Sequence, residues 1–181
     1  IKGTEYNRWI DDSYLLIGKA YFYKQEYIKA IEAFRLVSRQ FMGDITGYEA
    51  QIWLLRSYVE VADFSSADLV IENIVMDDAF PDKLNQPLSL ALANYYIKSE
   101  DAAMAIEELK TAITLTKKKG PKARYAYLLA QLYSQQGDFA SSTALFTKVI
   151  RTSPDYEMVF NAKINRARSY DTSSGDTEEI V

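Results

Sequence analysis

The side chains that most often perform catalysis are scarce in this sequence, which contains no cysteine and no histidine. Thiol and imidazole chemistry, the usual zinc ligands and a Ser–His–acid triad are therefore excluded. Paired carboxylates remain at Asp11-Asp12 and Asp77-Asp78, and paired serines at Ser65-Ser66 and Ser141-Ser142. We expect the first acidic pair in the opening turn of a helix, where acids are favoured electrostatically, and the second in a loop.

Sequence motifs for bound phosphate, metal or nucleophilic serine are also absent, because the chain has no glycine-rich phosphate loop, no HExxH and no GxSxG. We therefore predict that the protein is not an enzyme and that it uses no cofactor and no metal.

The densest run of positive charge is Lys117, Lys118 and Lys119, followed by Lys122 and Arg124. We expect this run at the C-terminus of a helix, where cations interact favourably with the helix dipole, and thus as a solvated helix end. An anionic lipid or a nucleic acid is the alternative. The net charge of −4 and the pI of about 5.0 argue against a general nucleic-acid surface.

The composition is typical of a folded protein, with 181 residues, 48% of them hydrophobic and 25% charged. This length suits one domain or one short repeat array. No apolar run approaches the length of a membrane span. Because the chain opens with Ile1, we expect it to have been processed or cut from a longer protein.

Two kinds of residue recur with a period of 37 or 38 residues. The recurring tyrosines are Tyr21, Tyr58, Tyr96, Tyr133 and Tyr170, and the recurring small residues are Ala30, Ala67, Ala105 and Ser142. Such a period indicates a solenoid in which each unit is a helical hairpin that cannot bury its own apolar face. We predict an all-α fold without strands, with nine helices forming four hairpins plus one, and with the recurring alanines at the closest helix contacts.

The repeats form a single expected domain, residues 1–181. Its units are 7–43, 46–80, 86–120, 121–154 and a partial unit, 155–181. Helices are predicted over 7–24 and 27–41, with Gly43 left-handed just past a helix end. We read Thr46 to Glu49 as a capping box and Gly120-Pro121 as a helix stop. Because the array ends in mid-repeat, the apolar face of its last helix should need a partner.

Gly18 and Tyr21 on one helix, followed by Tyr27, Ala30 and Phe34 on the next, resemble the tetratricopeptide repeat. The resemblance implies a right-handed superhelical solenoid of antiparallel helix pairs that binds a protein or peptide. The chain departs from the family in its longer period, since about 34 residues is usual. It departs also in Leu55, where a small residue is usual, and in Ala102, where an aromatic residue is usual.

Two segments, WIDDSYLLIGKAYFYKQEY and YEMVFNAKINRARSYD, are similar to tetratricopeptide lipoproteins of the Bacteroidetes cell envelope, in the gliding-motility and type IX secretion (SprE and PorW) group. This similarity implies a scaffold on the periplasmic side of the outer membrane, held by a lipid anchor outside this fragment, with partners in an envelope complex. A cytoplasmic tetratricopeptide adaptor is the alternative, and an outer-membrane assembly lipoprotein is a third reading.

The family resemblance further implies that first helices line a concave groove. Lys19, Arg56, Asn94, Gln131 and Arg168 would form its polar stripe of hydrogen-bond donors. The remaining groove candidates are Leu15, Phe22, Tyr23, Ile52, Val59, Leu90, Ile97, Lys98, Tyr127 and Ile164. Alternatively, the stripe is solvated or pairs with acids on neighbouring helices. The chaperone-tail clamp of the family is not expected, because Leu15 stands where that clamp needs lysine.

Overall fold

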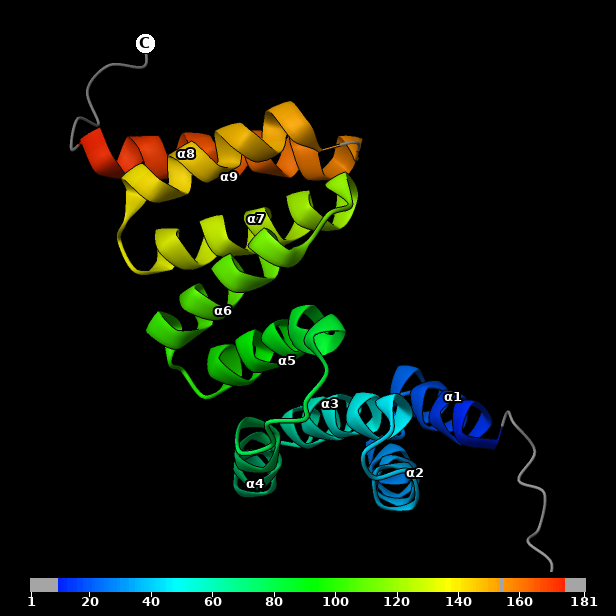
Figure 1. Ribbon diagram of the computed structural model, residues 1–181. Helices are drawn as coiled ribbons and strands as arrows, with labels where there is room; N and C mark the ends of the chain where they lie inside the picture. Colours follow the sequence, from blue (N-terminus) through cyan, green and yellow to red (C-terminus); the bar gives the residue numbers. More distant parts are fainter. Residues whose placement is uncertain (1–9, 154, 175–181) are drawn as a thin grey trace, which may run out of the picture. The chain divides into compact units, whose positions relative to one another are not determined.

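The computed structural model describes residues 10–153 and 155–174. Within these ranges the chain forms nine α-helices and one short 3₁₀ helix, and no strand is found among them (Figure 1). The predicted all-α solenoid of hairpins is confirmed. The chain divides into two compact units, the first ending at Ser99 and the second beginning at Glu100, in the middle of the third expected repeat.

The first unit contains five helices. They are α1 (Ile10–Tyr23), α2 (Tyr27–Gln40), α3 (Ile45–Glu60), α4 (Phe64–Val75) and α5 (Asn85–Lys98), with the 3₁₀ helix η1 (Asp82–Leu84) before α5. Helix α2 packs against α1 and α3, and α3 also contacts α4 and α5. The boundaries of α2 agree with the sequence prediction to within a residue. The predicted start of the first helix at Asn7 lies outside the described residues.

The second unit contains four helices, α6 (Ala102–Leu115), α7 (Lys119–Gln135), α8 (Phe139–Thr152) and α9 (Tyr156–Ser174). Helix α8 packs against both α7 and α9, and α6 packs against α7 (Figure 1). The core around α8 is built from small and aromatic residues, among them Ala126, Ala130, Phe146 and Ala162.

Each hairpin turns through one residue with a left-handed backbone. These residues are Gln25, Ala62, Glu100 and Gly137, with φ of 63°, 57°, 65° and 78°. In three of these four hairpins the next residue is an aspartate that caps the second helix: Asp63 accepts a hydrogen bond from the Ser66 amide at 3.1 Å, Asp101 from the Met104 amide at 3.1 Å, and Asp138 from the Ser141 amide at 3.0 Å. Hydrogen bonds from the hydroxyl and amide of Ser66 lower the pKa of Asp63, and those from the amide and hydroxyl of Ser141 lower the pKa of Asp138.

Small residues set the distance between helices. Ala30, Ala67 and Ala105 are completely buried, as predicted. Gly18 on α1 faces the ring of Phe34 on α2, so that a Cβ atom at Gly18 would lie 2.5 Å from Cε1 of that ring. These contacts follow from the repeat pattern, because a larger side chain at any of them would separate the packed helices.

The fourth small-residue position holds Ser142, whose hydroxyl lies 3.1 Å from the Ser169 hydroxyl on α9. Ser169 also lies 3.3 Å from Ser134 and donates to the Asn165 carbonyl. The buried serines therefore satisfy one another across α7, α8 and α9, where alanine fills the same position in earlier repeats.

Two predicted helix boundaries are wrong. Gly120-Pro121 does not stop a helix, because α6 already ends at Leu115 and both residues lie in the first turn of α7. Proline is tolerated there because a backbone N–H in the first turn has no acceptor within the helix. Thr46 does not cap α3, which begins at Ile45 after the N-cap Asp44. Thr46 is buried and donates to Asp11 on α1. Gly47 is required by a close approach, since a Cβ there would lie 2.1 Å from the Phe41 carbonyl oxygen.

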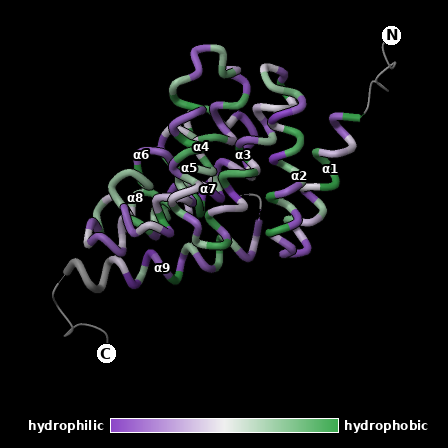
Figure 2. The backbone as a smooth tube through the Cα atoms, turned by 90° about the horizontal axis from the view of Figure 1, so that it is seen from below, coloured by the Kyte–Doolittle hydropathy of each residue, from purple (hydrophilic) through white to green (hydrophobic). Residues whose placement is uncertain are grey.

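Every described helix mixes hydrophilic and hydrophobic residues along its length (Figure 2). In the described part of the chain, none combines the length and the apolar character that crossing a membrane requires.

Candidate functional site

Three aromatic rings and a guanidinium pack together where α1 meets α3, with Tyr23 exposed, Phe22 and Arg56 half-buried and Trp53 buried. We call Phe22, Tyr23, Trp53 and Arg56 the aromatic patch. The Arg56 guanidinium lies 4.0 Å from the centre of the Trp53 ring and 4.9 Å from that of Phe22. Tyr23 packs edge-on against both rings, yet 71% of its surface is exposed. Tyrosine, tryptophan and arginine are the residues most enriched at the energetic centres of protein interfaces.

Trp53 was not among the predicted site residues. It follows Ile52, which was assigned to the groove, and the helix instead turns the indole toward Phe22. The available signal was the type of the residue, since tryptophan is rare in this chain, with only two present.

Lys19 and Asn94 of the polar stripe, and the groove candidate Lys98, are paired with acids on neighbouring first helices. Lys19 on α1 forms a 2.7 Å salt bridge with Glu49 on α3, and Lys98 on α5 forms one of 2.7 Å with Glu60. Asn94 donates to the same Glu60 carboxylate at 3.4 Å. The alternative of pairing with neighbouring acids is therefore what the structure shows for these residues.

The expected apolar flank of the groove is largely core. Leu15, Ile52 and Val59 are only 4%, 2% and 1% exposed. Their assignment to an open groove is wrong. Leu15 on α1 belongs to the core that α1 forms with α2 and α3, and Ile52 and Val59 lie on α3, which contacts α1, α2, α4 and α5 and has eleven of its sixteen residues buried. Leu90 is half-buried, whereas Ile97 is exposed on α5.

In the second unit, Tyr127 is held inside the α7–α9 packing. Its ring lies edge-on to Phe146 at 5.5 Å, and its hydroxyl accepts a 2.7 Å hydrogen bond from Asn165. Gln131 is half-buried, and Ile164 and Arg168 are exposed on α9. Lys19, Arg56 and Asn94 thus belong to the first unit, and Gln131 and Arg168 to the second.

The basic run lies at the opposite end of a helix from the one predicted. Lys117 follows the end of α6, Lys118 is the N-cap of α7, and Lys119 and Lys122 lie in its first turn. The prediction of a C-terminal helix end is wrong because α6 ends at Leu115. The helix dipole disfavours cations at an N-terminus, so it does not explain their position.

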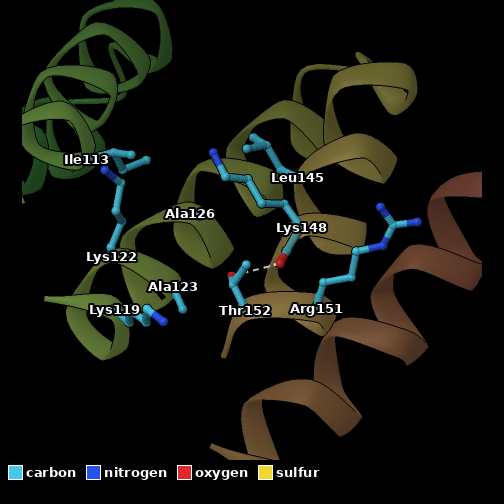
Figure 3. A pocket seen from close by; sticks show the side chains of 9 residues that line it. All are labelled: Ile113, Lys119, Lys122, Ala123, Ala126, Leu145, Lys148, Arg151 and Thr152. Carbon is cyan, nitrogen blue, oxygen red and sulfur yellow. Dashed lines mark hydrogen bonds between the residues drawn. The ribbon is translucent and has the colours of Figure 1, made fainter. Parts of the chain in front are cut away.

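Two of these lysines line a cavity of about 290 Å³ between α6, α7 and α8 (Figure 3). Its lining residues are Ile113, Lys119, Lys122, Ala123, Ala126, Leu145, Lys148, Arg151 and Thr152. We call it the basic pocket. Its inner surface is apolar, and no acid is found among the described residues that line it.

One carboxylate of each acidic pair and one of the paired serines have structural partners. Asp11 accepts from the Thr46 hydroxyl at 2.9 Å. Asp77 accepts from Tyr48 at 2.8 Å and thereby raises the pKa of that phenol. Ser142 is buried in the hydroxyl network. The described residues contain no group of three or more acids positioned to hold a metal ion.

Comparisons with known proteins agree with this architecture. A family model described as tetratricopeptide repeat matches residues 11–39, 87–119 and 123–156, together more than half of the chain. The second expected repeat, which carries the unusual Leu55, lies outside the match. No protein of curated function matches the chain.

Among solved structures, a protein from Podosopora anserina described as a putative kinesin light chain with nearly identical TPR-like repeats superposes with a TM-score of 0.70 at 17% identity, covering 90% of this chain and 86% of that one. A single-substitution variant of that protein gives 0.71 at 16%, covering 93% and 90%. The MamA protein gives 0.58 at 18%, covering 92% and 89%. At these identities the matches show the fold alone.

Proposed function

Because the chain belongs to the tetratricopeptide repeat family, we propose that it is a non-catalytic scaffold that binds a protein or peptide partner through its first helices. Solenoids of this kind commonly present such helices as an extended binding surface. The observation that carries the proposal is the aromatic patch, where an exposed Tyr23 adjoins a stacked Arg56 and Trp53. Tyr23 is the exposed ring of the patch, and because it already packs edge-on against Phe22 and Trp53 it loses little side-chain entropy on binding.

The non-catalytic part of the proposal is supported by the roles of the candidate acids. Asp11 and Asp77 are each engaged by a hydroxyl donor from another helix, which ties them to the fold. Purified protein should therefore show no hydrolase activity that is lost on replacing Asp11 or Asp12. Turnover that disappears in such a variant would contradict the proposal.

The binding surface can be tested with a variant that leaves the core untouched. Tyr23→Ser with Ile97→Ser removes two exposed apolar side chains from first helices α1 and α5. The matched control, Ile28→Ser with Leu69→Ser, removes two exposed apolar side chains from second helices α2 and α4. Tyr127→Ala is unsuitable, because its ring packs against Phe146.

The partner captured from extracts of the source organism is the readout. Loss of one aromatic anchor typically costs about 2 kcal/mol, so capture by the first-helix variant should fall by at least about tenfold. The control should capture as the wild type does, and circular dichroism should show both variants folded. Equal capture by all three proteins would overturn the proposed surface.

The proposal extends to location and assembly. We place the protein on the periplasmic side of the outer membrane, in a secretion and motility complex of the type IX kind. The two segments that resemble envelope lipoproteins support this placement. Fractionation of cells that express the full reading frame tests it. Recovery with the outer membrane and co-capture of envelope proteins is expected, whereas recovery in the cytosol would favour a cytoplasmic adaptor. Capture of outer-membrane assembly proteins instead would favour an assembly lipoprotein.

A further inference from the structure

The basic pocket combines an apolar interior with cationic side chains that form no salt bridge with any acid of residues 10–153 or 155–174. Ala123 and Ala126 form its buried floor, and Ile113 and Leu145 form half-buried walls. In Figure 3, Lys119 and Lys122 come from α7 on one side and Lys148 from α8 on the other, while the guanidinium of Arg151 extends away from them. The cavity thus presents a recess for an apolar group beside three ammonium groups.

No acid neutralises these cations within the part of the chain that is described. The salt bridges found there involve Lys19, Lys24, Lys29, Lys98 and Lys110, but none of the cations of the basic pocket. The one uncharged polar side chain of the pocket, Thr152, already donates to the Lys148 carbonyl at 2.8 Å. The ammonium groups are therefore the polar groups still available to a ligand.

The two cations on α7 occupy electrostatically unfavourable positions in the free protein. Lys119 and Lys122 are three residues apart in the first turn of α7, where like charges repel and the helix dipole disfavours both. Lys148 and Arg151 repeat the three-residue spacing near the C-terminus of α8, where the helix dipole favours cations and only their mutual repulsion is unfavourable. An anion bound among them would offset all of these repulsions. In a chain with a net charge of −4, this concentration of positive charge is local.

We propose that the basic pocket binds an acidic peptide segment in which one large apolar side chain is flanked by carboxylates. The apolar side chain would enter the recess over Ala123 and Ala126, and the carboxylates would accept hydrogen bonds from Lys119, Lys122 and Lys148. The volume, close to the lower end of ligand pockets at about 300 Å³, suits one anchoring side chain.

A peptide explains the pocket better than an anionic membrane does. The apolar residues are recessed below the cations, whereas insertion into a bilayer requires apolar groups that protrude. The pocket shares no residue with the aromatic patch that carries the proposed function. First helix α7 supplies Lys119, Lys122, Ala123 and Ala126 to it, second helices α6 and α8 supply the rest, and Tyr127, the groove candidate on α7, bonds to α9 instead. The inference rests on the proposed function in one respect, namely that the ligand is a segment of a protein.

The test is a binding titration with a fluorescent peptide in which leucine is flanked on both sides by glutamates. The pocket variant is Lys122→Glu with Lys148→Glu. The control is Lys83→Glu with Lys163→Glu, which changes the net charge equally at two exposed lysines outside the pocket. Glutamate is favourable in the first turn of α7, so the pocket variant should fold, and its melting curve verifies this.

We expect the pocket variant to bind the peptide at least tenfold more weakly and the control to bind within twofold of wild type. A peptide with glycine for leucine should also bind at least tenfold more weakly, and amide shifts of Ala123 and Ala126 in nuclear magnetic resonance should locate the site. Equal weakening in both variants, or no binding, would overturn the proposal. Pocket-dependent binding to phosphatidylglycerol vesicles without peptide binding would replace the peptide with a membrane. None of these results alters the capture experiment on the first helices.

Discussion

Replacing Gly18 by alanine should have two opposing effects on the stability of the first hairpin, a gain in helix propensity and a loss from overpacking. A Cβ atom at this position would lie 2.5, 2.8 and 2.9 Å from Cε1, Cδ1 and Cζ of Phe34. Real Cβ contacts are longer, so the ring must move or the helices must separate. The ring has little freedom, because Phe34 is completely buried and stacks on Trp53 at 5.9 Å.

The expected magnitude follows from two terms. Alanine is better than glycine in a helix by about 0.8–1 kcal/mol, which alone would stabilise α1. Overpacking a well-filled core costs about 1–3 kcal/mol. Because the three short contacts all involve a ring that cannot withdraw, we expect the second term to dominate. The net destabilisation should be about 1 kcal/mol, which lowers the melting temperature by about 2–4 °C in a protein of this size.

Urea unfolding followed by circular dichroism measures the change in free energy. Ala20→Gly on the exposed face of the same helix is the matched control and should cost about 1 kcal/mol from helix propensity alone. Phe34→Leu removes the obstructing ring, so Gly18→Ala should be less harmful in that background, with a coupling of at least about 1 kcal/mol. If Gly18→Ala raised the stability of the otherwise wild-type protein, the site would be open and the close-packing argument would be refuted.

Three further predictions concern packing, turns and pH. Ala67→Leu should overpack the α3–α4 contact and cost about 1–3 kcal/mol by thermal unfolding, and an unchanged melting temperature would show that the site accommodates the larger side chain. Because both positions have positive φ, Ala62→Gly should stabilise the protein and Gly137→Ala should destabilise it, each by about 1 kcal/mol in the free energy of unfolding, which a shift in melting temperature would report. A Cβ atom at Gly137 would meet no atom within 4 Å, so the second substitution measures backbone strain alone. Hydrogen bonds lower the folded-state pKa of Asp63 and Asp138, so the stability that these carboxylates contribute is complete above the unfolded-state pKa of about 3.9 and is lost as the pH falls toward the folded-state pKa. In the double variant Asp63→Asn with Asp138→Asn, the melting temperature should therefore fall less steeply with decreasing pH than in the wild type. An unchanged dependence of melting temperature on pH would contradict the capping role.

The helices and turns could be predicted because their signals are local. Asp63 and Asp138 occupy the same place in their repeats, where an aspartate can cap the helix that follows the turn. The small residues at Ala30 and Ala67 are similarly fixed by the period, since each repeat packs the same two helices. These features needed no knowledge of contacts between distant residues.

The wrong predictions arose where the same residues are compatible with two different places relative to a helix. Gly120-Pro121 is compatible with the end of one helix and with the first turn of the next, and only the end of α6 at Leu115 decides between them. That boundary placed the lysines at the wrong end of a helix. Leu15 and Ile52 were assigned to an open face because a repeat pattern does not show how many neighbours a helix has. Helix α3 has four, and they cover both of its faces.

The two candidate surfaces differ in whether their lysines form salt bridges with acids. These salt bridges join residues that are distant in the sequence, so sequence spacing does not reveal them. Lys19 lies thirty residues from Glu49 in the chain, and Lys98 lies thirty-eight from Glu60, yet each pair joins two successive first helices. These cations therefore contribute to stacking, and a partner at the first helices gains more from the aromatic patch than from them. Lys122 and Lys148 have no such acid among the described residues, and their charge is still available for binding. A single chain of this family can thus offer two chemically different contacts, one aromatic and nearly neutral, the other cationic around an apolar recess, and the paired variants proposed for each allow them to be lost independently.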